Sequence, residues 1–125
     1  MESFTDNDAL DTVLNYIKEK CDKLYICSKL AETYDEASNK FSLGYKALTL
    51  EGPSDYDEGR MLIIPEINDG LTTRDGDVRF YALVSDKEKK LLLSQELGNS
   101  KRVLAGNVFS ITKQRILQQR KLVVT

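Results

Sequence analysis

The stretch VRFYALVSDKEKKLLLSQELGNSKRVLAGNVFSI, residues 78–111, alternates apolar segments with charged or polar ones. The segments 78–84, 90–97 and 107–117 carry the apolar, β-branched and aromatic side chains that favour strands. The charged residues from Ser85 to Lys89 make a short connection, which favours a tight turn. The sequence therefore predicts an antiparallel hairpin of the first two segments, then a polar turn and a third strand.

The N-terminal part predicts one helix, at about residues 7–20, with Asp6 or Asn7 as its cap. Its apolar residues recur at helical spacing and are expected to pack on the sheet: Leu10, Val13, Leu14 and Ile17. Residues 23–28 contain strong β-formers and predict a strand. The polar segment 31–40 predicts a loop that holds one short helical turn.

The middle of the chain predicts further strands separated by turn-rich loops. Residues 45–50 are expected to form a strand, and residues 51–59, rich in turn formers, a loop. A second strand is expected at 60–67, at a sheet edge or with a bulge, because Pro65 cannot donate to a strand ladder. Residues 68–77 contain two Asp-Gly steps and predict another loop.

These elements predict a mainly β fold, a small antiparallel β-sandwich or barrel of about six strands with one N-terminal α-helix. A chain of 125 residues, 41% of them apolar, has the size of one domain. We therefore expect a single domain over residues 1–125, with the helix at about 7–20, the sheet at about 23–117 and a basic C-terminal arm at about 118–125. No apolar run approaches the length of a membrane span, and the acidic start does not resemble a signal peptide.

Charge is distributed unevenly along the chain. Residues 1–58 hold thirteen acidic and six basic residues, whereas residues 101–125 hold six basic residues and no acidic one. The C-terminal part alternates basic with apolar residues, and its candidate interface residues are Lys113, Arg115, Arg120, Lys121, Leu122 and Val123. Three interpretations stay open: docking on an acidic neighbour, ordinary solvated strand faces, and nucleic-acid binding, which the lack of interleaved aromatic residues disfavours.

Residue types that support catalysis are sparse. The chain has no histidine, which excludes the common triads and histidine–metal sites. Cys21 and Cys27 are expected to be buried thiols in a reducing compartment, and Cys27 is a weak candidate nucleophile. No glycine-rich phosphate loop is present, so no cofactor is expected. Acidic residues in two loops could supply calcium ligands but lack the EF-hand spacing: Asp55, Asp57, Glu58, Asp75 and Asp77.

Short motifs in a fixed order resemble those of a family of small virion proteins encoded by tailed bacteriophages and their prophages. The similarity covers roughly residues 10–112, and the chain departs from the family pattern in its Lys-rich composition and basic end. The residues that carry the resemblance are Ile26, Cys27 and Ser28; Tyr34, Glu36 and Ala37; Leu43 and Gly44; Gly59 and Arg60; Ala82, Leu83 and Val84; Leu91 and Leu92; and Gly106, Asn107, Phe109 and Ile111.

The resemblance implies a virion structural protein rather than an enzyme, most directly a capsid decoration or cement protein that acts by contact. Its expected partners are the major capsid protein or other virion proteins, in a symmetric multi-copy assembly or homo-oligomer located in the virion after assembly in the host cytoplasm. No membrane partner is expected. A neck, tail or fibre-attachment component is the alternative within the virion. A binding module outside the particle, such as a phage-encoded inhibitor of a host factor, is the alternative of another class.

Overall fold

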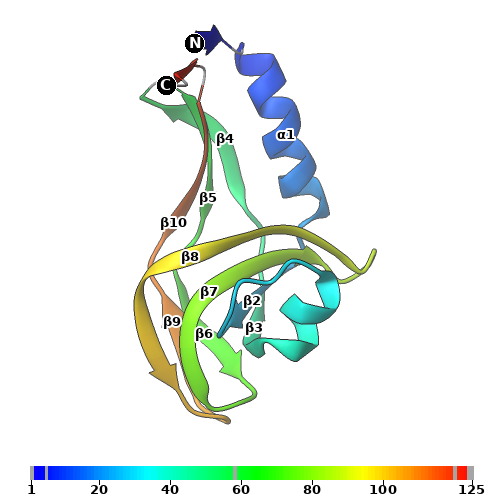
Figure 1. Cartoon of the computed structure of the whole chain (residues 1–125), viewed down its shortest axis with the longest axis vertical. Coiled ribbons are helices and arrows are strands. Elements are labelled where there is room, and N and C mark those ends of the chain that lie inside the picture. Colours follow the sequence, from blue (N-terminus) through cyan, green and yellow to red (C-terminus); the bar gives the residue numbers. More distant parts are fainter. Residues whose placement is uncertain (1, 5, 58, 120, 124–125) are drawn as a thin grey trace.

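The protein is mainly β, with one N-terminal α-helix, in a computed structural model that describes residues 2–4, 6–57, 59–119 and 121–123 (Figure 1). The helix α1 spans Asn7–Lys20. The strands are β1 Glu2–Phe4, β2 Lys23–Cys27, β3 Ser42–Ala47, β4 Glu51–Tyr56, β5 Gly59–Ile64, β6 Ile67–Thr72, β7 Gly76–Ser85, β8 Lys90–Val103, β9 Val108–Ile111, β10 Gln114–Gln119 and β11 Lys121–Val123.

Six of these strands form a strongly curled antiparallel sheet with the order β8-β7-β2-β3-β6-β9. A second sheet, β10-β5-β4, extends away from it with α1 alongside, and β1 pairs with β11 (Figure 1). The chain passes between the two larger sheets after β3, after β5 and after β9. The expected mainly β architecture with an N-terminal helix is therefore confirmed, and its strands are distributed over separate sheets.

The helix α1 begins where the sequence predicts. Asp6 is the N-cap, and its side chain accepts a 2.8 Å hydrogen bond from the backbone N–H of Ala9. Leu10, Leu14 and Ile17 are buried as expected. Val13, however, is 47% exposed, so its predicted place on the buried face is wrong. The buried stripe follows the i, i+4, i+7 positions and is narrower than the sequence suggests.

The hairpin predicted from the opening stretch is confirmed. β7 and β8 pair antiparallel, with Ser85 opposite Lys90, and a four-residue turn joins them. Lys89 adopts a left-handed conformation, with φ of 55°, to close this turn. The polar turn expected after residue 97 is wrong in extent, because β8 continues to Val103 opposite Gly76. Residues 97–100 bulge out of the ladder, and pairing with β7 resumes at Lys101, opposite Val78, which local propensity does not reveal.

Two segments predicted as loops contain strands. β4 lies within 51–59 and pairs with β5, and a register shift between Glu51 and Ser54 accommodates Pro53. β6 occupies the first part of 68–77. Its Asp-Gly step does not make a turn, because Gly70 lies in the strand directly under the ring of Phe109. In both segments, pairing and packing override turn-forming composition.

Three other strand predictions need correction. For 60–67 the sequence predicts an edge position or a bulge, and the edge position is wrong because β5 is the central strand of its sheet. Its ladder with β4 does contain a register shift, but the extra residue lies on β4, and Pro65 lies just beyond the end of β5. The strand expected at 45–50 starts earlier and ends at Ala47. The strand expected at 107–117 is two strands, β9 and β10, which belong to different sheets. The helical turn expected in 31–40 is present as Glu36–Lys40.

Both faces of the curled sheet carry buried side chains. The larger cluster includes Leu24, Ile26 and Leu83 from the inner face, together with Leu14 of α1 and Leu62 of β5. The smaller cluster lies on the opposite face, where the helical turn after β2 packs, and consists of Tyr25, Cys27, Ala31, Ala37, Ala82 and Val84. Alternation along β2 and β7 sends successive side chains to these two clusters. The sheet is thereby fixed from both sides.

Candidate binding groove

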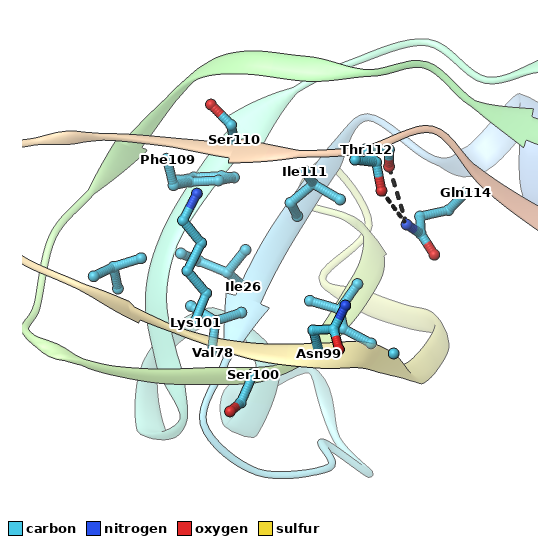
Figure 2. Close-up of a pocket in the computed structure, with 13 residues that line it drawn as sticks. Ile26, Val78, Asn99, Ser100, Lys101, Phe109, Ser110, Ile111, Thr112 and Gln114 are labelled. Carbon is cyan, nitrogen blue, oxygen red and sulfur yellow. Dashed lines mark hydrogen bonds between the residues drawn. The ribbon is translucent and has the colours of Figure 1, made fainter.

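A groove opens where the curled sheet brings its two edge strands, β8 and β9, to face each other (Figure 2). Its volume is about 450 Å³, within the range typical of ligand-binding clefts. The residues that line it come from β2, β7, β8, β9 and the start of β10: Ile26, Val78, Leu97, Gly98, Asn99, Ser100, Lys101, Val103, Phe109, Ser110, Ile111, Thr112 and Gln114.

The floor of the groove is apolar. Ile26, Val78, Phe109 and Ile111 are all buried and belong to the larger core cluster. They reach the groove because they lie on the inner face of the curl, at alternate positions of their strands. Because these side chains are already buried, a ligand entering the groove would meet a fixed apolar floor without any rearrangement of them.

One cation lies over this floor. Lys101 is opposite Val78 in the β7–β8 ladder, so the two side chains share the inner face of the sheet. Figure 2 shows the Lys101 side chain extending across the gap toward Phe109. No aspartate or glutamate lines the groove, and no ion pair of Lys101 is found among the described residues. The groove thus offers a positive charge beside an apolar surface.

The walls of the groove are unpaired strand edges. Within the described chain, β8 pairs only with β7, and β9 pairs only with β6. Because five antiparallel pairings separate them, β8 and β9 run in opposite directions. Beyond β9 the same edge continues into β10, where Gln114 donates a 3.0 Å hydrogen bond to the carbonyl of Thr112. Both walls present backbone groups of the kind that another strand would pair with.

The basic residues predicted from the sequence lie next to this groove rather than in it. Lys113 occupies the link between β9 and β10, and Arg115 is exposed on β10, whose next residue, Ile116, is buried. Leu117 is exposed as well. Arg120 lies outside the described residues.

The other three candidate interface residues, Lys121, Leu122 and Val123, form β11, whose backbone pairs with β1 of the same chain. Leu122 is opposite Ser3 and Val123 opposite Glu2, and Lys121 is opposite Phe4. In the isolated chain this terminal strand is therefore already paired. The addition of β11 to the sheet of a neighbouring molecule stays a prediction. It would require β11 to give up its pairing with β1.

The acidic loop residues have partners within the chain. Asp55 accepts a 2.8 Å hydrogen bond from Arg60, and Asp75 accepts one of 2.8 Å from the backbone N–H of Ala105. Asp77 lies 3.7 Å from Arg102. Glu58 is outside the described residues, and the described part of the chain holds no group of three or more metal-ligating side chains. The geometry lends no support to the calcium alternative.

The two thiols are buried and free, as expected. Burial raises the pKa of Cys27 to about 12 and that of Cys21 to about 11. The Sγ of Cys27 lies 3.6 Å from the carbonyl of Ala37, to which it donates. The ammonium of Lys29, two residues away, lies over the ring of Phe41 instead. Both thiols are held protonated at neutral pH, and the thiolate is the nucleophilic form.

A polar cluster that the sequence does not reveal surrounds Asp86, in the turn between β7 and β8. Lys23 forms a 2.7 Å ion pair with Asp86, and the hydroxyls of Tyr25 and Tyr34 donate hydrogen bonds of 3.1 and 2.7 Å to the carboxylate. Burial raises the pKa of Asp86, but the hydrogen bonds from Lys23, Tyr34 and Tyr25 lower it by more than burial raises it. The pKa of Asp86 therefore lies below its ordinary value. The cluster ties β2, the helical turn region and the hairpin together.

The groove residues were also missed, because Gly98 to Lys101 were interpreted as a turn. No local signal in LGNSKRV, residues 97–103, marks these residues as a strand. No family model, no curated protein and no solved structure matches the chain. The resemblance to phage virion proteins therefore stays a prediction. No helix among the described residues has the length and apolar character needed to cross a bilayer.

Proposed function

We propose that this chain is a virion structural protein of a tailed phage, a capsid decoration or cement protein that binds the major capsid protein by surface contact. The observation that carries the proposal is the groove between β8 and β9, an apolar cleft with two unpaired strand edges on a sheet packed from both sides. Such a site is suited to holding another polypeptide.

The residues of the family resemblance support this interpretation because several of them maintain the fold. Gly44 has no room for a Cβ atom, which would collide with the carbonyl oxygen of Leu71. Arg60 joins β5 to α1 through a 2.8 Å ion pair with Asp11. Gly106 adopts a left-handed conformation, with φ of 88°. Because these residues build the scaffold, we assign the function to the surface that the scaffold presents.

An apolar patch at one end of the curled sheet gives a second contact surface. Leu71 on β6 and Val108 on β9 are directly opposite in the ladder and are 45% and 68% exposed. Leu104, 48% exposed, lies in the turn between β8 and β9. The backbone N–H of Gly106 in this turn donates a 2.9 Å hydrogen bond to the carbonyl of Thr72 at the end of β6. Clusters of exposed apolar side chains frequently mark protein interfaces.

The test is attachment to particles. Particles of the phage or prophage that encodes the chain are purified with and without its gene, and recombinant protein is added to the depleted particles. We expect wild-type protein to bind at a symmetric copy number and the Leu104→Asp/Val108→Asp variant to bind at least about tenfold more weakly, because charges would be buried in the contact. Leu30→Asp, an exposed leucine on another segment, is the matched control and should bind normally.

The location of the protein distinguishes the alternatives. A decoration protein is distributed over the capsid shell, whereas a neck, tail or fibre-attachment component is found at one vertex or on the tail by immunolabelling. Absence of the protein from purified particles, measured by mass spectrometry, would contradict the proposal. Recovery of the protein in complex with one host protein would then indicate the inhibitor alternative.

A further inference from the structure

We propose that the groove between β8 and β9 binds an extended segment of a partner protein, which adds as a strand between the two edges and places a carboxylate beside Lys101. The inference rests on the proposed function in one respect only, that the protein which supplies the segment is a virion protein. The site itself is defined by its backbone edges, its apolar floor and its single cation.

The main chain of the segment would find partners on both sides. One wall is β8 at residues 97–101, where residues 97–100 bulge out of the β7 ladder between the Phe80–Glu96 and Val78–Lys101 pairs. The other wall is the outer edge of β9 at 108–111. A strand bound to an ordinary sheet edge forms one ladder, whereas a strand in this gap forms two. Because β8 and β9 run in opposite directions, the segment is antiparallel to one wall and parallel to the other.

The side chains of the segment are determined by the two faces of the curl. Residues that point inward meet Ile26, Val78 and Ile111, which favour Val, Ile or Leu at alternate positions. Residues that point outward reach solvent and are polar. This alternation gives the partner segment the pattern of a half-buried strand rather than that of an amphipathic helix.

The positive charge of Lys101 favours an acidic inward-pointing residue at one end of the bound segment. Lys101 extends over the floor from β8, and the described residues that line the groove include no carboxylate. Lys101 is exposed in the isolated chain, and an inward aspartate or glutamate in the bound segment would pair with its ammonium above the apolar floor. Lys113 and Arg115, both exposed along the continuing edge, favour acidic residues at the outer end of the same segment.

The experiment uses the isolated full-length chain and a capped synthetic peptide, Ser-Val-Thr-Val-Thr-Glu-Ser, labelled for fluorescence anisotropy. Its valines and glutamate share one face, and a second peptide replaces Glu by Lys. We expect the Glu peptide to bind wild type and to bind Lys101→Glu about tenfold more weakly, since an opposed like charge disfavours association. The Lys peptide should show the reverse preference, binding Lys101→Glu better than wild type.

A matched control separates this contact from general charge effects. Lys87→Glu makes the same charge change in the exposed β7–β8 turn, outside the groove, and should bind both peptides as wild type does. Hydrogen exchange supplies the backbone readout. We expect the bound peptide to protect amides at residues 97–101 and at 108–111, because strand addition on both sides gives these groups new acceptors.

Two results would overturn the proposal. One is no binding of the Glu peptide to wild type at about 1 mM, the range of the weakest specific contacts. The other is binding of the Glu peptide that leaves the amides of either wall unprotected from hydrogen exchange, or that Lys87→Glu weakens as much as Lys101→Glu does. Because these measurements need no particle, they can fail while attachment to particles succeeds, and attachment can fail while peptide binding succeeds. The two proposals are therefore tested separately.

Discussion

The ring of Phe109 on β9 occupies the position that a Cβ atom of Gly70 on the neighbouring strand β6 would take. The two residues are directly opposite in the ladder, and the ring covers the glycine. This contact keeps Phe109 buried next to the groove, where it forms part of the floor. The absence of a Cβ atom at Gly70 on β6 thus allows Phe109 on β9 to form part of the groove floor.

Gly70→Ala tests this relationship. The added methyl group must displace the Phe109 ring, and we expect a loss of about 1–3 kcal/mol in the free energy of unfolding, the usual cost of overpacking. Gly98→Ala is the matched control, because a Cβ atom at Gly98 meets nothing within 4 Å. That variant should be unchanged or slightly stabilised in urea unfolding. Equal stabilities for the two variants would contradict the role assigned to the ring.

Adjacent positions on α1 should differ sharply in their tolerance of truncation. Leu14 is fully buried in the larger core cluster, so Leu14→Ala should cost about 2–5 kcal/mol. Val13 is largely exposed, and Val13→Ala should change stability by less than about 0.5 kcal/mol. Urea denaturation followed by far-UV circular dichroism measures both. A larger loss for Val13→Ala than for Leu14→Ala would show that the helix packs through another face.

Asp86 should contribute to stability in a pH-dependent way. Its pKa in the folded state is lowered, so its contribution is present above the unfolded pKa of about 3.9 and is lost as pH falls through the folded pKa. We expect Asp86→Asn to lose about 1.5–3 kcal/mol at pH 7, the usual range for hydrogen bonds to a charged group, and to lose less further stability on acidification than wild type does.

The control for Asp86 is Asp69→Asn, which removes an ion pair with Lys46 at the exposed surface. This change should cost less than about 1 kcal/mol at any pH. Thermal unfolding between pH 7 and pH 2 compares the three proteins. Identical pH profiles for wild type and Asp86→Asn would show that the cluster of Lys23 and the two tyrosines adds nothing to stability.

Cys27 should react slowly with thiol reagents. Its thiol is fully buried, and burial raises its pKa to about 12, so little thiolate is available at pH 8. We expect labelling by a disulfide reagent to require local or global unfolding and to accelerate in urea in parallel with the unfolding transition. Cys27→Ser should bind partners normally with reduced stability. Fast labelling of the folded protein would instead revive a chemical role for this residue.

The sequence predicted the elements whose signal is local. The helix at Asn7–Lys20 and the hairpin around Ser85–Lys89 follow from spacing and turn chemistry within a few residues. The Asp-Gly step at Gly70 misled, because a glycine can serve a turn or the close approach of a ring, and only the tertiary structure decides between them. Pro53 misled in the same way, since a register shift lets β4 include it.

The groove could not be predicted, because it depends on which strands end up at the sheet edges. Lys101 and Phe109 are eight residues apart along the chain and come from strands at opposite ends of the sheet order. Their proximity arises from the curl, which no local pattern encodes. The basic residues singled out near the C-terminus were visible from composition alone, whereas Lys101 gained its importance from its register with Val78.

The three passages of the chain between the two larger sheets have a mechanical consequence. After β3, β5 and β9 the backbone crosses from one sheet to the other, the last time through Thr112 and Lys113 only. Sliding one sheet along the other would therefore require three covalent connections to deform together. The two sheets are therefore expected to move as one unit rather than to slide along each other.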